Sequence, residues 1–226
     1  SHLKNGAKKV IVSAPCKNAD KTVVFGVNHN KIGKNDNIIS AASCTTNCLS
    51  PIADVINKNF TIQNGFMTTI HAFTTDQRIL DNSHKDPRRA RSASQSIVPT
   101  SSGASNAIGE IIPSLKGKLG GIAMRVPTPN VSLVEFVFNV KKNISKEKLN
   151  NSFSKASNSY LKNILDITKE KLVSIDFNHN SASAILDSSL TNVVGSKMGK
   201  VSVWYDNEWG FSNRMCDIAR YLSKIN

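Results

Sequence analysis

The hydrophobic pattern of this chain changes near residue 43, and the change narrows the choice of fold sharply. Before it, short apolar runs near 9–14, 22–27 and 37–42 are bounded by polar turns, as in buried strands of an α/β sheet. The first run follows a segment with the pattern of a helix end closed by Gly6. After residue 43, strands and helices no longer alternate strictly, which is typical of an α+β body. The sequence therefore predicts an α/β opening followed by an α+β part.

The later elements are predicted from periodicity and from helix caps. The chain has helical patterns at about 44–58, 103–115, 145–157 and 211–224, with Ser145 as an N-cap. The last helix should bury the face that carries Phe211, Met215, Ile218, Ala219 and Leu222. Strand patterns occur at about 65–73, 120–127, 131–142, 171–177, 182–187 and twice within 189–205. Residues 74–102 form a long polar loop, and such a loop inside a compact domain is more often functional than idle.

Composition excludes several classes of protein. With 39% hydrophobic and 20% charged residues among 226, the chain is not of the wholly disordered type. It contains no apolar run long enough for a membrane span, and no secretory segment. Four cysteines do not form a disulfide scaffold in a chain of this length. A reducing, cytoplasmic location is therefore the expectation.

The charge balance is strongly positive, with 29 Lys+Arg against 16 Asp+Glu and a net charge of +13. Most of the excess is lysine scattered among Asn and Ser, the pattern of a solvated surface. Arginines gather only in the segment 85–91, which can bind either nucleic acid or small phosphates. That segment has no interleaved aromatic residues and no recognition-helix pattern. Nucleic acid is therefore not expected as the main partner.

The strongest local signal is the sequence SCTTNC at residues 43–48. It places Cys44 where a strand gives way to a helix, and the first-turn amides of a helix stabilise an anion. The sequence predicts a lowered pKa for Cys44 and a thiolate nucleophile. Cys48 lies one turn further along the same face and is interpreted as a packing residue. An inert buried thiol is the alternative for Cys44 taken alone.

His71 ends a strand-like run and strengthens the case for Cys44. A histidine beside a helix-start cysteine can hold the thiolate as an ion pair and then act as a base. The alternative is that His71 is a structural histidine at the rim of the core, with its hydrogen bonds made by neighbouring groups. A metal site of Cys44, Cys48 and His71 has no fourth ligand at zinc-like spacing, so no metal is expected.

Further polar groups are suited to anions and amides. The hydroxyl-rich run 99–104 precedes a helix and can expose backbone N–H groups to a phosphate, or form an ordinary N-cap. Arg125 is a lone cation in an apolar strand and needs either an acidic partner or an anionic ligand. Asn207 follows an aromatic strand end and can offer a donor and an acceptor to a carboxamide.

Taken in order, these motifs resemble those of the phosphorylating (type I) glyceraldehyde-3-phosphate dehydrogenase family. The resemblance rests on SCTTNC at 43–48, TTIHA ending at 72, the basic segment 85–91, RVPT at 125–128 and WYDNEWG at 204–210, and it extends from residue 1 to 226. It implies the end of a Rossmann-type NAD(P)-binding domain at residues 1–43. It also implies an α+β catalytic domain with a mixed, mainly antiparallel sheet at 44–206. Residues 207–226 would be a C-terminal helix packing back on the first domain.

The resemblance also implies an activity. Cys44 would attack glyceraldehyde 3-phosphate to give a thiohemiacetal, and His71 would take the proton as hydride leaves for NAD, or alternatively NADP. Inorganic phosphate would cleave the resulting thioester to give 1,3-bisphosphoglycerate, a step of glycolysis and gluconeogenesis. Members of the family are commonly homotetramers.

Further roles are carried over by position. Thr74, Asp76 and Arg125 match the substrate-phosphate site. The inorganic-phosphate site is matched by Ser43, Thr45, Arg89, Ser102 and Gly103, and the cofactor site by Ser13, Thr75 and Asn207. Asp76 stands where some members have Thr, and Ser102 where Thr is commoner.

Some features depart from the family pattern. No glycine-rich dinucleotide motif is present, so we expect an N-terminally truncated sequence. Erythrose-4-phosphate dehydrogenase is the closest alternative, suggested by DFNHN at 176–180, although the sequence TSSG at 100–103 speaks against it. A Cys-His thiol hydrolase would need only Cys44 and His71. A non-catalytic RNA-binding protein would use the basic surface instead.

Overall fold

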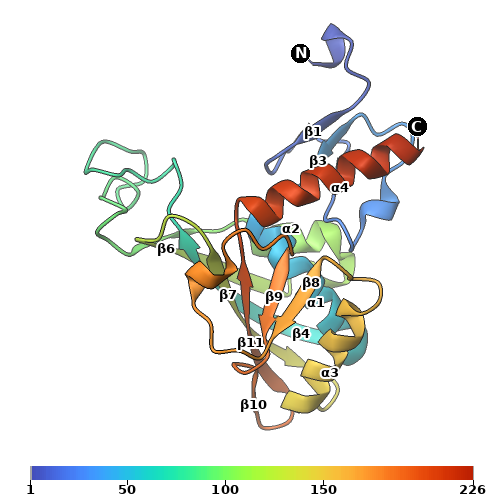
Figure 1. Ribbon diagram of the computed structural model, residues 1–226, viewed down its shortest axis with the longest axis vertical. Helices are drawn as coiled ribbons and strands as arrows, with labels where there is room; N and C mark the ends of the chain where they lie inside the picture. The colour runs from blue at the N-terminus through green and yellow to red at the C-terminus, as the bar shows by residue number, and fades with distance from the viewer. Residues whose placement is uncertain (1, 226) are drawn as a thin grey trace.

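The computed structural model describes residues 2–225 and contains two sheets of different character (Figure 1). The smaller sheet has three parallel strands, β1 (Val10–Val12), β2 (Lys21–Thr22) and β3 (Ile38–Ser40), in the order β1-β3-β2. Val12 and Thr22 both pair with Ser40, so the carboxyl ends of all three strands lie at one edge. Ligand sites of parallel sheets lie outside this edge.

The larger sheet has eight strands in the order β5-β6-β4-β7-β11-β9-β8, with β10 added beside β11. Only the pairs β4–β6 and β8–β9 are parallel. The predicted fold class is therefore confirmed: a parallel α/β part precedes an α+β part with a mixed, mainly antiparallel sheet. The strands are β4 (Ile62–Ala72), β5 (Val98–Ser101), β6 (Leu119–Val126), β7 (Ser132–Val140), β8 (Leu165–Thr168), β9 (Ala184–Asp187), β10 (Asn192–Val194) and β11 (Met198–Tyr205).

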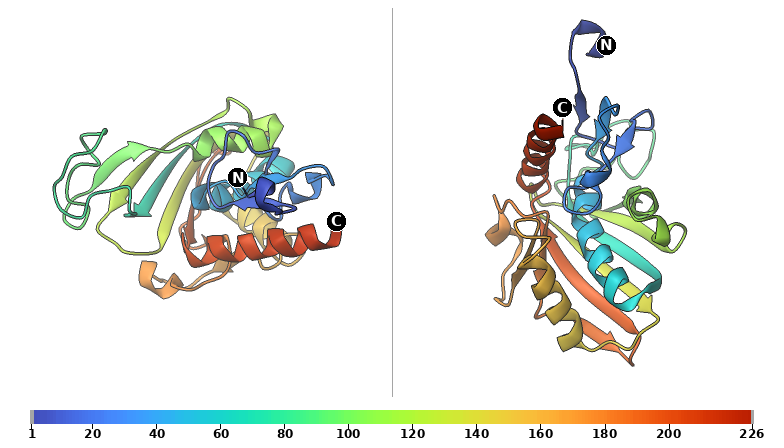
Figure 2. Two further views of the ribbon diagram at one scale, coloured as in Figure 1. Left: turned by 90° about the horizontal axis from the view of Figure 1, so that it is seen from above. Right: turned by 90° about the vertical axis from the view of Figure 1, so that its right-hand side faces the viewer.

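Three helices cover one face of the larger sheet, and a fourth covers the smaller one (Figures 1 and 2). On the larger sheet lie α1 (Cys44–Phe60), α2 (Ala104–Ile111) and α3 (Lys146–Ser157). The C-terminal helix α4 (Trp209–Ile225) packs Ile218 and Leu222 against Ile39 of β3. Short 3-10 helices lie at η1 (Leu3–Asn5), η2 (His29–Lys31), η3 (Pro113–Leu115) and η4 (Ser174–Phe177).

Helix α1 is the centre of the main core. It runs through Pro51 without ending, and Ile52 and Ile56 are fully buried against the sheet. On the facing strand β7, Val134 and Phe136 are fully buried as well. Burying an aliphatic or aromatic side chain of this size contributes about 1.5–3 kcal/mol each. The helix that begins with Cys44 is thus anchored along most of its length.

The opposite face of the larger sheet is only partly covered. Burial along β7 alternates strictly, and Glu135 and Val137 on the uncovered side are half-buried. Phe66 on the neighbouring strand β4 is 50% exposed. The segment 169–183 covers part of this face, where Phe177 stacks on Trp204.

Four expectations about local structure were wrong or inexact. Residues 174–177 form the 3-10 helix η4 and not a strand, because the segment that pairs with β9 is Leu165–Thr168. The second strand ends at Thr22, and a turn follows in which Gly26 has a φ of 87°. The helix predicted at 103–115 breaks before Pro113, which begins η3. Ala219 is exposed on α4, and Arg214 is buried there in its place. The N-cap Ser145 was predicted correctly and accepts from the Lys148 N–H.

Candidate active site

The turn between β3 and α1 is built to present Cys44. Ala42 adopts a φ of 59°, a conformation that non-glycine residues rarely take and that clusters at functional sites. The buried Asn47 amide donates to the carbonyls of Ala41 (2.8 Å) and Ser43 (2.9 Å), which holds the turn closed. Ser43 caps the helix by accepting the Thr46 N–H at 3.1 Å. Cys44 is consequently the first residue of α1 and faces the end of β4.

Cys44 and His71 lie in contact. The Cys44 Sγ is 3.4 Å from the His71 Nε2. His71 is the penultimate residue of β4 and is 3% exposed, and its ring meets the Tyr205 ring edge-on at 5.9 Å. The geometry fits a thiol whose proton passes to an imidazole.

Arg125 is the third member of this group. The parallel pairing of β4 with β6 sets Arg125 beside His71, and the Arg125 Nη1 lies 2.7 Å from the His71 Nδ1 and 2.8 Å from the Ala72 carbonyl. No acidic side chain among residues 2–225 forms an ion pair with Arg125, and its buried Nε has no partner there. The cation is thus left for an anionic ligand.

The protonation of His71 follows from this environment. Burial and the Arg125 charge lower the pKa of His71 to about 4, so the ring is neutral at pH 7. An arginine N–H only donates, so in the tautomer in which Arg125 donates to Nδ1 the single ring proton lies on Nε2, toward the sulfur. In the other tautomer Nδ1 donates to the Ala72 carbonyl 2.7 Å away, and Nε2 becomes a base for the thiol.

The pKa of Cys44 is raised, whereas the sequence predicted that it would be lowered. Burial raises the pKa of the Cys44 thiol, and this outweighs the lowering by the Thr45 backbone N–H and by the Arg125 charge. The helix terminus acts as expected, but desolvation is stronger. Burial also raises the pKa of Cys48, which is fully buried and packs under Val203, in agreement with a packing role.

A pocket of about 230 Å³ opens above Cys44. It gathers side chains from the β3–α1 turn, β4, the start of α2 and β6. Seven of the residues singled out in the sequence line it: Ser43, Cys44, Thr45, His71, Ser102, Gly103 and Arg125. Pro15 lines it as well and follows β1, so this pocket lies at the carboxyl edge of the parallel sheet.

The other predicted phosphate-binding residues lie in the loop 73–97 and do not line this pocket. Arg89 forms an ion pair with Asp76, and its Nε donates to the Thr100 hydroxyl at 2.8 Å. Burial raises the pKa of Asp76, but the neighbouring Arg89 charge and its hydrogen bond hold that pKa below its usual range. Thr74 donates its N–H to Gln77 at 3.0 Å. Asp76 therefore positions an arginine here and does not face Cys44.

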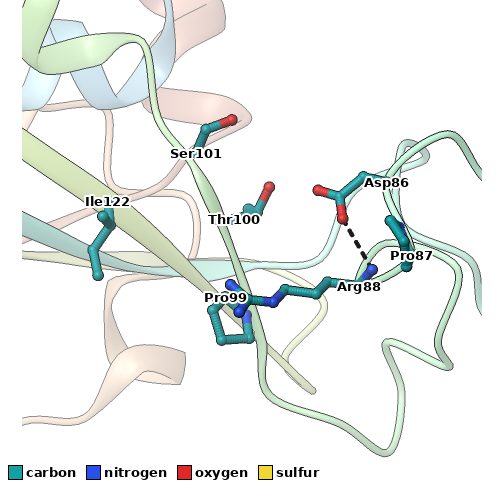
Figure 3. A pocket seen from close by; sticks show the side chains of 7 residues that line it. All are labelled: Asp86, Pro87, Arg88, Pro99, Thr100, Ser101 and Ile122. Atoms are coloured by element: carbon teal, nitrogen blue, oxygen red, sulfur yellow. Dashed lines mark hydrogen bonds between the residues drawn. The ribbon is translucent and has the colours of Figure 1, made fainter.

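A second pocket, of about 530 Å³, lies between β5 and residues 86–88 of the loop 73–97 (Figure 3). Its lining includes Arg88, Pro99 and Ile122, and the Arg88 backbone N–H donates to the Asp86 carboxylate at 2.9 Å. Figure 3 shows the Arg88 side chain extending toward Pro99. Only Ser101 lines both pockets. Neither Cys44 nor His71 lines the second pocket.

The three predicted cofactor residues differ in burial: Asn207 is buried, whereas Ser13 and Thr75 are exposed. Asn207 is 7% exposed, and its Oδ1 accepts the Ser132 hydroxyl at 2.8 Å. Ser132 uses the oxygen of this amide, so the Asn207 Nδ2 remains as a donor for a carboxamide oxygen. Ser13 is exposed just past the carboxyl end of β1, and Thr75 is exposed at the start of the loop 73–97. The residues present thus fit a nicotinamide carboxamide.

Two residues at the site were missed by sequence reasoning. The buried Tyr205 hydroxyl lies 2.9 Å from the Thr45 Oγ1 and 2.8 Å from the Thr69 Oγ1, and so fixes the Thr45 side chain. Ser132 links Asn207 to β4. Burial of both could be read from strand alternation, but their partners lie 60 or more positions away in sequence.

The described residues contain neither a metal site nor a membrane-spanning helix. Between residues 2 and 225, no three His, Cys, Asp or Glu side chains are grouped so that they could hold a metal ion. In the same range, no helix combines the length and the apolar character that crossing a membrane requires.

Comparisons with known proteins agree with this geometry. The family model described as "Glyceraldehyde 3-phosphate dehydrogenase, C-terminal domain" matches residues 43–207. Glyceraldehyde-3-phosphate dehydrogenase 2 of Nostoc sp. is 54% identical over 224 residues, covering 99% of this chain and 66% of the relative. Glyceraldehyde-3-phosphate dehydrogenase of Geobacillus stearothermophilus is 52% identical over 223 residues, covering 98% of this chain and 67% of the relative.

A chloroplastic relative is equally similar. Glyceraldehyde-3-phosphate dehydrogenase GAPB of Arabidopsis thaliana is 54% identical over 225 residues, covering 98% of this chain and 50% of the relative. The chain thus spans between 50% and 67% of the length of these three curated relatives. On the family match and these identities, the chain belongs to the glyceraldehyde-3-phosphate dehydrogenase family.

Proposed function

We propose that this chain carries out the phosphorylating oxidation of glyceraldehyde 3-phosphate to 1,3-bisphosphoglycerate with NAD, or alternatively NADP. One observation carries the proposal: the Cys44 Sγ lies 3.4 Å from the His71 Nε2, in the pocket that also contains Arg125 and several hydroxyl groups. The reaction belongs to glycolysis and gluconeogenesis. The names of the relatives support the same conclusion.

The first step is addition of the thiol to the aldehyde. The Cys44 Sγ forms a bond to the carbonyl carbon as Nε2 of His71 takes the thiol proton. The backbone N–H of Cys44, at the start of α1, helps to stabilise the developing oxyanion. For this step His71 must have a free lone pair on Nε2, the tautomer in which Nδ1 donates to Ala72.

Oxidation gives a thioester on Cys44. The nicotinamide ring, when bound, supplies the hydride acceptor. Asn207 would hold its carboxamide through Nδ2, with Ser13 and Thr75 close to the cofactor. His71 first returns the thiol proton to the oxyanion, which completes the thiohemiacetal, and its free Nε2 then accepts the hydroxyl proton as the carbonyl re-forms.

The two phosphate groups are assigned to two sets of residues. Arg125 and Thr74 bind the phosphate of the substrate, because Arg125 is a half-buried cation that forms no ion pair with an acidic side chain of residues 2–225. Inorganic phosphate binds among Ser43, Thr45, Arg89, Ser102 and Gly103. A phosphate oxygen then attacks the acyl carbon, the carbon–sulfur bond breaks, and Cys44 leaves as a thiolate. Asp76 serves this site indirectly, by orienting Arg89.

The domain division follows from the two sheets. We propose that residues 1–43 belong to the dinucleotide-binding domain, 44–206 to the catalytic domain, and 207–226 to the helix that returns to the first. The separate core around Val23, Ile39 and Ile218 supports this division. The four cysteines are all free, which supports a cytoplasmic location. Recovery of the protein from an organelle or the periplasm on cell fractionation would contradict that location.

We also propose that the protein is a homo-oligomer, with the tetramer of the family as the expected state. The partly uncovered face of the larger sheet supports this, since apolar side chains there surround a single ion pair between Lys200 and Glu135. These side chains are Phe66, Ile70, Ile122, Met124, Leu133 and Val137. Light scattering should show an oligomer, and Phe66→Lys should shift it toward smaller species. A wild-type monomer contradicts the proposal.

The decisive assay compares aldehydes with and without phosphate in the full-length protein expressed from its gene. Glyceraldehyde 3-phosphate should reduce NAD or NADP in a reaction that depends on inorganic phosphate and gives an acyl phosphate. A clear preference for erythrose 4-phosphate at equal concentration would assign the chain to the sister activity. Ester or thioester hydrolysis without nicotinamide would favour a Cys-His hydrolase.

An RNA-binding role is less well supported than the enzymatic one. Two arginines of the loop 73–97 are already paired, Arg89 with Asp76 and Arg91 with Asp81. Their charges are therefore partly neutralised within the loop. Tight, salt-dependent RNA binding that survives alkylation of Cys44 would overturn this preference.

A further inference from the structure

Ser132 joins two parts of the site that are far apart in the sequence. It is the first residue of β7 and is 1% exposed. Its Oγ accepts the Ala72 N–H at 3.1 Å and donates to the Asn207 Oδ1 at 2.8 Å. Ala72 follows His71 on β4, and its carbonyl meets the His71 Nδ1. One hydroxyl thus connects Asn207 to the strand that carries the base.

The directions of these two hydrogen bonds follow from chemistry. A backbone N–H can only donate, so Ser132 must accept from Ala72. Its own hydroxyl proton is then free for Asn207 and is donated to the Asn207 Oδ1, so the oxygen end of the amide points inward. The NH2 end of the amide therefore points away from Ser132.

The backbone of Asn207 is held independently of Ser132. The buried Asp206 accepts the N–H groups of Glu208 (2.9 Å) and Trp209 (2.8 Å) at the start of α4. Its other oxygen accepts from the His179 N–H at 2.8 Å and from the Asn130 side chain at 2.9 Å. With the main chain fixed, the principal freedom left to Asn207 is rotation of its amide by half a turn, which exchanges donor for acceptor.

We propose that Ser132 is a positioning residue that fixes the Asn207 amide with its NH2 group toward the ligand, so that the site selects the carbonyl oxygen of a nicotinamide carboxamide. This inference rests on the proposed function, since it assigns Asn207 to the cofactor. Without the Ser132 hydroxyl, the amide would occupy both orientations, and only one of them binds. The ligand would also lose a donor whose direction is set in advance.

The test measures dissociation constants for NAD or NADP, whichever binds the full-length wild-type protein more tightly, by calorimetry without substrate. Ser132→Ala should weaken binding about 5- to 10-fold, as expected for one lost hydrogen bond. Ser202→Ala is the matched control. Ser202 is a fully buried serine on the adjacent strand β11 whose hydroxyl has no partner in the described chain, and its replacement should leave binding unchanged.

A double-mutant cycle separates positioning from general damage to the fold. If Ser132 acts through Asn207, then Ser132→Ala in an Asn207→Ala background should change the dissociation constant by less than about twofold. An equal loss in both backgrounds would show that Ser132 acts elsewhere, and the inference would be wrong. Thermal melting of each variant reports any general loss of stability.

A second measurement needs no variant. The 3-acetylpyridine analogue of the cofactor keeps the carbonyl oxygen but has a methyl group in place of the amide NH2. If the Asn207 NH2 faces the ligand, this analogue should bind the wild-type protein within about threefold of the natural cofactor. Binding weaker by tenfold or more would mean that the oxygen end of Asn207 faces outward, and would overturn the inference.

The outcomes distinguish this inference from the proposed function. A wild-type protein that binds the cofactor but does not oxidise glyceraldehyde 3-phosphate contradicts the function alone. Cofactor binding that is unchanged by Ser132→Ala contradicts the inference alone. A wild-type protein that binds neither NAD nor NADP contradicts both.

Discussion

Replacing Cys44 with serine is expected to lower kcat for phosphate-dependent oxidation of glyceraldehyde 3-phosphate on the order of 10³-fold or more. A serine hydroxyl ionises far less readily than a thiol, and the neighbouring His71, with a pKa of about 4, is too weak a base to activate it. An oxygen ester would also react with phosphate more slowly than a thioester. Reduced cofactor formed per second at saturating substrate measures the loss in the full-length protein.

Cys216→Ser is the matched control for this experiment. Cys216 is a free and exposed cysteine on α4, outside the pocket that contains Cys44. Its replacement should leave kcat and KM unchanged. Activity of the Cys44 variant within tenfold of wild type would show that the nucleophile lies elsewhere and would contradict the mechanism.

The second large effect is expected for His71→Asn, which should lower kcat by about 10²- to 10⁴-fold, the usual contribution of a general base. Asparagine keeps a polar side chain near the Ala72 carbonyl but cannot accept the thiol proton. The loss should appear in kcat more than in KM, because the His71 ring acts on Cys44 and on the reacting oxygen. Initial rates over a range of aldehyde concentrations separate the two constants.

His179→Asn is the matched control for His71. His179 has a φ of 64°, a conformation that asparagine adopts well, and its side chain is exposed. Its backbone N–H, which donates to Asp206, is retained in the variant. Unchanged activity is expected here. If His71→Asn keeps more than a tenth of the wild-type kcat, the general base is another group or water.

The same His71 variant tests whether the low pKa of His71 makes the stability of the protein depend on pH. His71 titrates at about 4 in the folded protein and at about 6.5 when unfolded, so the unfolded state binds the proton first as pH falls. Stability is therefore fully present above pH 6.5 and is lost as pH falls to about 4, by roughly 3 kcal/mol at most. Urea unfolding should show this window in wild type and lose it in His71→Asn. Loss of stability over the same window in both proteins would assign it to other groups.

Local signals in the sequence were sufficient for many elements of the fold. The strand-to-helix step before Cys44 and the N-cap at Ser145 were predicted correctly, and the long loop after His71 was predicted except for its last residues, which form β5. Each depends on residues within one or two turns of the chain. Strand β8 was missed because its four residues alternate only weakly, and they are ordered by parallel pairing with β9, about twenty positions away.

At the candidate site too, local features were predicted from the sequence and contacts between distant residues were not. Cys44 and His71 were paired from residue type and order alone, and the structure places them in contact. The direction in which the pKa of Cys44 shifts was predicted wrongly. The charge at the helix terminus can be inferred from sequence, whereas the degree of burial cannot. The contact between Arg125 and His71 was not foreseen either, since it requires β4 and β6 to be neighbours.

The sequence by itself indicated the proposed nucleophile and base and determined the class of fold, because helix starts, strand alternation and the chemistry of Cys and His are local properties. Only the tertiary structure decided which groups surround them. Parallel pairing of β4 and β6 brought Arg125 to the Nδ1 of His71, and the start of β7 brought Ser132 between Ala72 and Asn207. The charge states of these groups and the orientation of the Asn207 amide depend on such distant neighbours and on the exclusion of water. Neither the neighbours nor the exclusion of water can be inferred from the residue at a single position.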